Sequence, residues 1–365
     1  MANAQYLQKH WHVRDNDSVT LREKVTRRRK VAETLPTREC HPPAPVSRRR
    51  LLVLLVAAAA LAAGCSQGSE DRPDQSATLV LDFQPNAVHA GIYLALTRDF
   101  DDAEGVTLRV QPPSSSTDSV KLLLAGRAQF AILDIHDLAL AREKRRDLIG
   151  VMAVVQRPLA ALMAQPDVRR PRDLEGRRAG VTGLPSDDAV LRSIVRGDGG
   201  DPTKVRKVTI GFQAVAAMLA GRVDAATAFW NAEGVALRAR RPSIRQFKVD
   251  EFGAPPYPEL VLCVTRETLR NERPLVAATV RALRRGYEET IVDPESAVEA
   301  LVERAGVTRA ATARELDAVS PTFTAGGSRY GALDRGALEA WSEWEARFGI
   351  TKRPPDVALA FAPGF

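Results

Sequence analysis

Apolar and polar residues follow one another in two kinds of segment, short apolar runs and longer amphipathic stretches. "TLVLDF" (78–83) is typical of a buried strand, and "HAGIYLALTRDFDDAEG" (89–105) has the spacing of a helix that ends at Gly105. The same order recurs in "VTLRVQPP" with "SSSTDSVKLLLAGRAQ", and in "FAILDI" with "HDLALAREKRRD". Strands that alternate with helices predict an α/β protein with a mostly parallel sheet.

The pattern restarts after two further predicted strands, "LIGVMAVVQ" and "LAALMAQ". We interpret "RRPRDLEGRRAGVTG" as the crossing into a second unit, in which the strands "RAGVT", "VRKVTIG" and "DAATAFW" alternate with helices. "ELVLCVTRETL" (259–269) predicts a strand that returns to the first unit, and 274–347 is largely helical. We therefore predict a first lobe of 78–168 and 260–365, and a second lobe of 169–259.

The two predicted lobes contain similar segments. "LLLAGRAQFAIL" and "AAMLAGRVDAAT" each place Leu-Ala-Gly-Arg after a helix, then one residue, then Gln or Asp before a buried strand. This likeness indicates two similarly wound lobes that face each other across a cleft.

The N-terminal part predicts an export signal. "SRRRLLVLLVAAAALAAGC" joins three arginines to an apolar run of 13 residues, too short to span a bilayer but typical of a signal peptide. "LAAGC" resembles a bacterial lipobox, in which Cys65 would be acylated; the alternative is a signal peptide cleaved elsewhere. We expect residues 1–64 to be absent from the mature protein and 65–77 to be a lipid anchor and flexible tether. Both the general and the twin-arginine export routes stay open.

The charge distribution gives little support to a nucleic-acid partner. The formal net charge is +7, and residues 1–64 alone hold 12 basic and 5 acidic residues, so the remainder is neutral. With Cys65 acylated, Cys263 has no partner, which excludes a disulfide framework and a thiolate metal cluster.

Polar and aromatic residues gather at four predicted strand ends. In open α/β sheets, ligands bind beyond the carboxyl ends of strands, here "DFQPNAVH" (82–89), "DIHD" (134–137), "GLPSDD" (183–188) and "FWNAEG" (229–234). Taken singly, these residues have ordinary interpretations as helix caps, a corner histidine or core packing. The candidate ligand-binding residues, which include Tyr93 and Tyr257 from outside the four corners, are Phe83, Asn86, His89, Tyr93, Asp134, His136, Ser186, Asp187, Trp230, Asn231, Glu233 and Tyr257.

Together, these side chains suit a flat, nitrogen-rich ring that carries an amine. Aromatic rings can stack on it, carboxylates accept from N–H groups, and an amide both donates and accepts. The sequence has no HExxH, CxxC, GxSxG or P-loop motif, so metal-dependent hydrolysis, serine catalysis and nucleotide hydrolysis lack support. We expect no catalytic residue, no cofactor and no metal.

The stretch "LDFQPNAVHAGIYLA" resembles the W-x-P-N-x-x-H-x-G-x-Y opening of the thiamine-pyrimidine family, whose ligand is hydroxymethylpyrimidine (HMP) or a related compound. The family contains substrate-binding lipoproteins of ABC importers and the fungal HMP synthases. "DIHDLALAREK", "GRRAGVTGLPSDDAVLR" and "AFWNAEGVAL" follow in the family's order, so the likeness covers roughly 78–350. The resemblance implies the type II periplasmic-binding fold, two α/β lobes around a ligand cleft with two crossing strands as hinge.

The resemblance implies an exported, lipid-anchored monomer that delivers HMP or formylaminopyrimidine to an ABC permease and ATPase, without chemistry. Alternative ligands are riboflavin and a sulfonate, although a sulfonate favours a fixed positive charge and no Arg lies in the four corners. A sensor that presents its ligand to a receptor is a further alternative.

Three departures from the family pattern bear on activity. Phe83 stands where many relatives have Trp, and His136 looks aligned with the reactive His of the synthases. The synthases' cofactor lysine corresponds to Ile132, which cannot form a Schiff base with pyridoxal phosphate. Their cysteine-rich iron motif lies near "PPYPELVLC", which holds only Cys263. An enzyme of the synthase type is therefore disfavoured.

Overall fold

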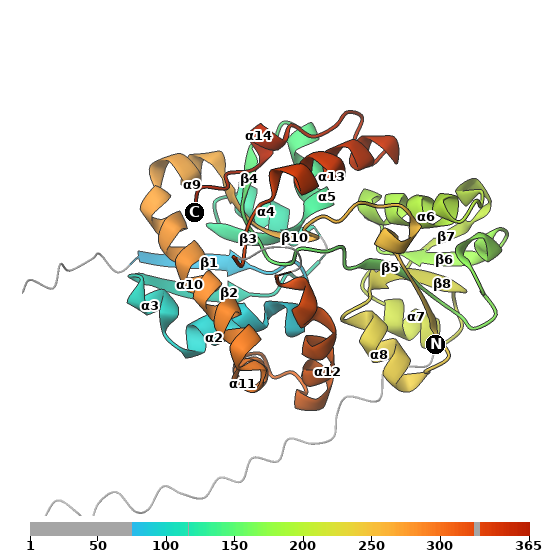
Figure 1. Ribbon diagram of the computed structural model, residues 1–365, viewed down its shortest axis with the longest axis horizontal. Helices are drawn as coiled ribbons and strands as arrows, with labels where there is room; N and C mark the ends of the chain where they lie inside the picture. Colours follow the sequence, from blue (N-terminus) through green and yellow to red (C-terminus); the bar gives the residue numbers. More distant parts are fainter. Residues whose placement is uncertain (1–74, 116, 325–328) are drawn as a thin grey trace, which may run out of the picture. The chain divides into compact units, whose positions relative to one another are not determined.

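Two five-stranded mixed sheets, each covered by helices, form the folded part of the chain (Figure 1). The computed structural model describes residues 75–365 except 116 and 325–328. The first sheet has the order β2-β1-β3-β10-β4, with β10 antiparallel to both neighbours. Its strands are β1 (Gln75–Val80), β2 (Val106–Gln111), β3 (Phe130–Asp134), β4 (Leu148–Ala153) and β10 (Leu260–Thr265).

The second sheet has the order β7-β6-β8-β5-β9, with β5 antiparallel to both neighbours. Its strands are β5 (Ala160–Ala164), β6 (Arg178–Val181), β7 (Arg206–Thr209), β8 (Ala225–Phe229) and β9 (Arg245–Lys248). In the first sheet β1 pairs with β2 and β3, and in the second β6 pairs in the same way with β7 and β8. An antiparallel strand then extends each sheet, β10 beside β3 and β5 beside β8. The prediction of two similarly wound α/β lobes is confirmed.

Helices cover both sheets, and those after β10 belong to the first lobe (Figure 1). The first lobe holds η1 (Ala87–His89), α2 (Ala90–Thr97), α3 (Phe100–Ala103), α4 (Asp118–Leu124), α5 (Ile135–Glu143), α9 (Arg266–Asn271), α10 (Arg273–Val292), α11 (Pro294–Ala305), α12 (Arg309–Val319), η5 (Ser320–Thr322), α13 (Arg335–Arg347) and α14 (Val357–Ala360). The second holds η2 (Pro171–Leu174), α6 (Pro185–Gly197), η3 (Pro202–Lys204), α7 (Ala214–Leu219), α8 (Glu233–Arg240) and η4 (Val249–Phe252).

The repeated Leu-Ala-Gly-Arg segment ends a helix in the same way in both lobes. Gly126 after α4 and Gly221 after α7 both have φ of +66°. In each case the following arginine donates its N–H to the carbonyl five residues back, as in a Schellman motif. This conformation is left-handed, which glycine adopts at little cost.

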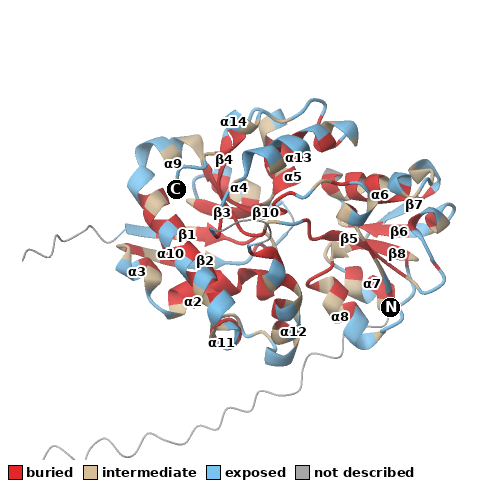
Figure 2. Cartoon of the chain, viewed as in Figure 1, coloured by how far each residue is buried: buried red, intermediate tan, exposed pale blue. Residues whose placement is uncertain are grey.

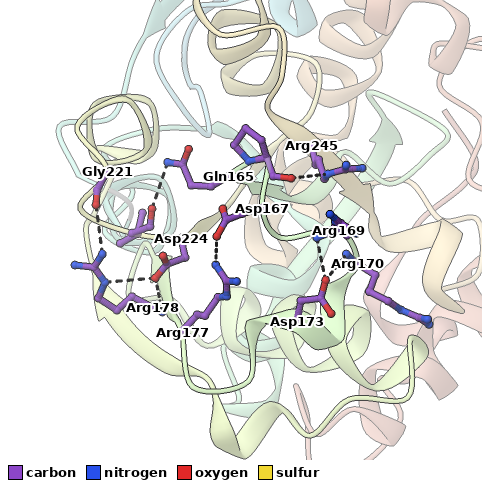
Figure 3. A network of polar contacts seen from close by, with 12 residues as sticks. Gln165, Asp167, Arg169, Arg170, Asp173, Arg177, Arg178, Gly221, Asp224 and Arg245 are labelled. Carbon is purple, nitrogen blue, oxygen red and sulfur yellow. Dashed lines mark hydrogen bonds and ion pairs between the residues drawn. The ribbon is translucent and has the colours of Figure 1, made fainter.

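The polar residue three positions after each of these glycines accepts a backbone N–H from the corresponding strand of its lobe, β1 or β6. Gln129 Oε1 accepts the N–H of Thr78 in β1 at 2.9 Å. Asp224 Oδ2 accepts the N–H of Arg178 in β6 at 2.9 Å, within the polar network of Figure 3. The sequence likeness therefore reflects one structural unit used twice.

The first crossing between the lobes differs from the sequence interpretation. The predicted boundary at 168 places β5 in the first lobe, but β5 pairs with β8 and β9 in the second sheet. The chain therefore crosses at 154–159, between β4 and β5, and not after 168. Four strands, β3, β5 and β10 inside the sheets and β4 at the edge of the first sheet, are buried at nearly every position (Figure 2). A continuous apolar run such as β5 suits a central strand of either sheet, so its pattern does not assign it.

The N-terminal end of the fold also differs slightly from expectation. Residues 75–77, predicted as the end of the tether, form the first half of β1, where Gln75 pairs with Val106 of β2. Backbone groups make this ladder, so polar side chains do not prevent it. The predicted signal peptide and Cys65 lie outside the described residues. Within the described part of the chain, no helix has the length and apolar character needed to cross a membrane.

Two glycines set the close approach of α2 to α10. A Cβ on Gly91 would lie 2.2 Å from the ring of Tyr287, and a Cβ on Gly286 would lie 2.1 Å from the carbonyl oxygen of Gly91. Tyr287 Oη also donates to the carbonyl oxygen of Val88 at 2.8 Å. This packing holds the beginning of α2, and with it the strand-to-helix corner at 82–89.

Candidate ligand-binding site

A cavity of about 100 Å³ lies between the two sheets, at the ends of β1, β3, β6 and β8. Both lobes contribute to its wall, and so does Glu259, in the segment through which the chain returns to the first lobe. This position agrees with the rule that ligands of open α/β sheets bind beyond the carboxyl ends of strands. The volume suits a small molecule, since sites for drug-sized ligands are about 300–1,000 Å³.

Seven of the twelve sequence-predicted residues line the cavity. They are Phe83, Asn86, Asp134, His136, Ser186, Asp187 and Glu233. The other five lie outside the set of lining residues: His89, Tyr93, Trp230, Asn231 and Tyr257. The structure therefore brings together members of all four predicted corners.

His89 supports the first corner from behind. It is fully buried, and its Nδ1 accepts the N–H of Asn86 at 3.2 Å. The other ring nitrogen, Nε2, must then carry the proton, and it lies 2.8 Å from Asp82 Oδ1. Asn86 Oδ1 accepts the N–H of Val88 at 3.0 Å and caps η1. His89 thus orients Asp82, which does line the cavity.

The other residues outside the cavity wall have packing roles. Tyr93 lies in the apolar core of the first lobe, and burial raises the pKa of its phenol. The indole N–H of Trp230 donates to the carbonyl oxygen of Pro158 at 3.0 Å, so Trp230 braces the first crossing. Asn231 is buried, and neither polar atom of its side chain has a hydrogen-bond partner among the described residues. Tyr257 lies beneath the cavity, beside His136.

Aromatic rings from both lobes meet at the cavity. Phe83 of the first lobe lies edge-to-face on Phe212 of the second, with ring centroids 4.6 Å apart. Phe229, at the end of β8, lines the cavity as well. The aromatic residues among those that line the cavity are therefore Phe83, Phe212 and Phe229, and Trp230 is not among them.

Six carboxylic acids line the cavity, and none of its lining residues is a lysine or an arginine. The six are Asp82, Asp134, Asp137, Asp187, Glu233 and Glu259. Burial raises the pKa of Asp137 to about 7, against the opposing effect of His136, and it also raises the pKa of Glu233 to about 7. Such a site favours ligands that donate hydrogen bonds or carry positive charge, and disfavours anions.

Two acids of the second lobe are held by neighbouring backbone and hydroxyl groups. Asp187, in the first turn of α6, accepts from the hydroxyl and the N–H of Thr182. Burial raises the pKa of Asp187, and the Thr182 bonds oppose this effect. Glu233 Oε2, at the start of α8, accepts the N–H of Phe229 at 3.3 Å. Both carboxyl groups are therefore fixed in position on the wall that faces the first lobe.

His136 and its partners form the floor of the cavity. Nδ1 of His136 lies 2.6 Å from Glu345 Oε1 on α13, and Nε2 lies 3.2 Å from Tyr257 Oη. Burial alone would lower the pKa of His136, but the carboxylates of Glu345 and Asp134 outweigh it and raise the pKa to about 10. The neighbouring carboxylates therefore favour the protonated form of the imidazole.

Glu259 lies in the second segment that crosses between the lobes and forms hydrogen bonds with the first. Its Oε2 accepts the N–H groups of Leu159 at 2.6 Å and Ala160 at 3.0 Å, where the first crossing enters β5. Its backbone carbonyl accepts the N–H of Ile135 at the start of α5. Oε1 has no hydrogen-bond partner among the described residues, although the side chain is fully buried.

Comparison with known proteins assigns the chain to a family. The model of the family described as NMT1/THI5 like matches residues 86–297, which is more than half of the sequence. The chain belongs to the NMT1/THI5-like family. The resemblance noted in the sequence is thereby confirmed.

Two curated relatives of this chain are named for different activities. This chain is 31% identical over 237 residues to the formylaminopyrimidine-binding protein of Halalkalibacterium halodurans. The aligned region covers 64% of this chain and 72% of that protein. This chain is 23% identical over 231 residues to the 4-amino-5-hydroxymethyl-2-methylpyrimidine phosphate synthase of Legionella pneumophila. The aligned region covers 62% of this chain and 72% of that protein. One of these relatives is a binding protein and the other an enzyme.

Solved structures show the same fold. The periplasmic aliphatic sulphonate binding protein SsuA of Escherichia coli is 14% identical, with a TM-score of 0.64, and the match covers 79% of this chain and 92% of that one. This NMT1/THI5-like protein therefore has the periplasmic-binding-protein fold that the sequence predicted.

Several residues that line the cavity are not among those predicted from the sequence, and each has a physical reason. Phe212 follows β7, a fifth strand end that the corner rule would have included. Asp82 and Asp137 lie inside corners that were noted, but no pattern distinguished them from helix-start acids. Glu259 lies in the returning segment, where no sequence signal marks a ligand-binding position.

Proposed function

We propose that this protein is the substrate-binding component of an ABC importer and that it captures a small aminopyrimidine. The ligand would be formylaminopyrimidine or 4-amino-5-hydroxymethyl-2-methylpyrimidine. The observation that carries the proposal is the cavity between the lobes, with six carboxylic acids, three phenylalanines and no cationic residue other than His136 in its wall. The formylaminopyrimidine-binding relative supports the same ligand class.

The wall offers the groups that an aminopyrimidine needs. Phe83 and Phe212 provide apolar surface for a flat ring, contributed by opposite lobes. Asp187 and Glu233 on the second lobe, with Asp82 on the first, can accept hydrogen bonds from an exocyclic amine or a ring N–H. A ligand bound between the lobes contacts both, so it favours their closed arrangement through its differential affinity for that state.

The charge of the cavity argues against a sulfonate, despite the structural likeness to sulphonate-binding proteins. A sulfonate would bring a fixed negative charge to a wall of carboxylic acids, where like charges repel. None of the lining residues is an Arg or Lys that could compensate.

The synthase alternative is disfavoured by two residues. Ile132, at the position of the synthases' cofactor lysine, lines the cavity and has no amine. Cys263 is fully buried in β10, and burial raises the pKa of its thiol, which makes it a poor metal ligand or nucleophile. Capture without chemical change is the function that these side chains support.

The proposal extends to location and partners. An importer component would be exported, held at the outer face of the cell membrane through acylated Cys65, and act as a monomer with a permease and an ATPase. The signal and the lipobox lie in residues outside the described part of the chain, so this proposal rests on their sequence alone.

Native mass spectrometry of the purified protein tests the ligand class directly. We expect a co-purified or added aminopyrimidine to bind one to one, and millimolar formylaminopyrimidine to raise the melting temperature by mass action. An unchanged melting temperature with both pyrimidines, together with a rise with riboflavin or an alkanesulfonate, would overturn the proposal.

A further inference from the structure

The floor of the cavity holds a group of side chains whose geometry differs from that of an ordinary ion pair. Ligand atoms of Asp134, His136 and Glu259 lie within 4.8 Å of one another. All three residues line the cavity, His136 and Glu259 are fully buried, and Asp134 is half-buried. We infer that these three side chains form a binding site for a divalent transition-metal ion such as Zn²⁺.

The first observation is the unpartnered oxygen of Glu259. Oε1 is buried and has no hydrogen-bond partner in the described structure, while Oε2 is occupied by two backbone N–H groups. A buried carboxylate oxygen without a hydrogen-bond partner lowers the stability of the folded protein. Such an atom therefore indicates a bound group that the structure does not contain. Oε1 lies 3.6 Å from Nε2 of His136. A tetrahedral ion with bonds of about 2.0–2.1 Å holds its ligand atoms roughly 3.4 Å apart.

The second observation is the second carboxylate behind the histidine. Glu345 Oε1 lies 2.6 Å from His136 Nδ1, which fixes the ring and directs Nε2 toward Glu259. Metal-binding histidines commonly donate their other N–H to a carboxylate in this way. A metal on Nε2 replaces the 3.2 Å contact with Tyr257 Oη.

The third observation is the balance of charge. Glu259 and Glu345 lie 3.6 Å and 2.6 Å from the imidazole nitrogens of His136, and an oxygen of Asp134 lies within 4.8 Å of one of them. None of the three carboxylates forms an ion pair with a lysine or arginine among the described residues. Buried charges in proteins are normally paired or bound to a metal. One Asp134 oxygen accepts the N–H of His136 at 2.7 Å, which leaves its second oxygen for the ion.

One nitrogen and two oxygen ligands suit Zn²⁺ and its first-row neighbours. Three protein ligands leave one position open, and this position would face the cavity. The sequence analysis expected no metal because the ligands come from β3, α5 and the returning segment, so no short motif contains them. The inference does not depend on which organic ligand the cavity takes.

Cobalt(II) binding tests the site without any organic ligand. Full-length protein without an affinity tag is stripped with a chelator and titrated with Co²⁺, and the visible d–d absorption and the bound metal are measured. We expect about one Co²⁺ per chain with the intense spectrum of a four- or five-coordinate site, displaced by Zn²⁺. Histidines at 10, 12 and 41 could also bind metal, so each variant is compared with the unsubstituted protein.

Three conservative variants localise the ion. Asp134→Asn keeps the oxygen that caps α5, Glu259→Gln keeps an acceptor for the first crossing, and Glu345→Gln changes only the group behind the histidine. We expect each to weaken Co²⁺ binding at least 10-fold, in line with the 10–100-fold effect of changing an outer carboxylate. Asp101→Asn is the matched control, since Asp101 is a buried acid that accepts the backbone N–H of Leu108 at 2.9 Å in β2.

Melting curves confirm that each variant is folded before the titrations are compared. Metal content equal in the unsubstituted protein and the three variants would overturn the inference, and so would an equal loss in Asp101→Asn. Loss of Co²⁺ binding in Asp134→Asn alone suffices to support the site if Glu259→Gln does not fold.

Discussion

Single carboxyl groups in the cavity have pKa values that make the protein sensitive to pH. The folded-state pKa of Glu233 is about 7, whereas its ordinary value is 4.5. Between these values the folded chain binds more protons than the unfolded chain, so the contribution of Glu233 to stability is lost as the pH rises from about 4.5 to 7. Glu233, which is proposed to accept hydrogen bonds from the ligand, therefore lowers the stability of the ligand-free protein at neutral pH.

Glu233→Gln removes this titration and keeps the shape of the side chain. We expect the variant to gain roughly 1–3 kcal/mol relative to the unsubstituted protein between pH 5 and pH 8, because one pKa unit is worth about 1.4 kcal/mol. Urea unfolding of both proteins at the two pH values measures the difference. A difference that does not change with pH would contradict the raised pKa.

His89 is expected to act on stability first and on binding only through Asp82. In His89→Ala, Asp82 loses its 2.8 Å partner and the N–H of Asn86 loses its acceptor. We expect a loss of about 1–3 kcal/mol of unfolding free energy for these buried groups. Asn86→Ala removes the cap of η1 and an exposed bond from Asn86 Nδ2 to the carbonyl oxygen of Gln84, and should cost about 0.5–2 kcal/mol. If chemical denaturation finds His89→Ala the milder change, His89 does not have this supporting role.

At the scale of elements, the position of the first corner depends on how closely α2 approaches α10. Gly91 and Gly286 leave no room for a Cβ between these helices. The helix that begins at the corner is thus placed by a contact with residues almost 200 positions further along the chain.

Gly91→Ala should destabilise the protein by about 1–3 kcal/mol through overpacking, in spite of the better helix propensity of alanine. Gly336→Ala is the control, since Gly336 is exposed in the first turn of α13 and a Cβ there meets only Asp334 Oδ1 at 3.4 Å. Thermal melts should show Gly336→Ala unchanged or more stable. Equal stability of Gly91→Ala and the unsubstituted protein would mean that the two helices can separate at no cost.

The sequence predicts the strands, helices and lobes better than it predicts strand pairing and side-chain contacts. Two similar lobes were predictable from the alternation of strands and helices and from the repeated Leu-Ala-Gly-Arg segment. Periodicity and helix ends depend on residues that are close in sequence, so the sequence alone indicates them. The sheet that β5 joins depends on long-range pairing, and its apolar run is compatible with either sheet. Trp230 was predicted to face the ligand but braces Pro158, since burial of a large ring does not say on which side of a strand it lies.

At the scale of the whole molecule, we propose that the folded lobes lie outside the cell, attached through a lipid anchor at Cys65. Cys65→Ala should move the protein from the membrane fraction to the soluble fraction of cells, because acylation of this residue is the proposed attachment. Fractionation followed by immunodetection measures this. A variant that stays in the membrane fraction after a high-salt wash would contradict the lipobox interpretation.

Calorimetric titration of formylaminopyrimidine, with an alkanesulfonate as the paired ligand, tests the central claim most directly. The carboxylic acids of the cavity predict that the pyrimidine binds one to one and the sulfonate does not. Glu233→Gln should weaken pyrimidine binding roughly 5- to 150-fold, the equivalent of about 1–3 kcal/mol for a lost acceptor. Binding of the sulfonate with no binding of the pyrimidine, or pyrimidine affinity unchanged in Glu233→Gln, would contradict the proposed capture of an aminopyrimidine in this cavity.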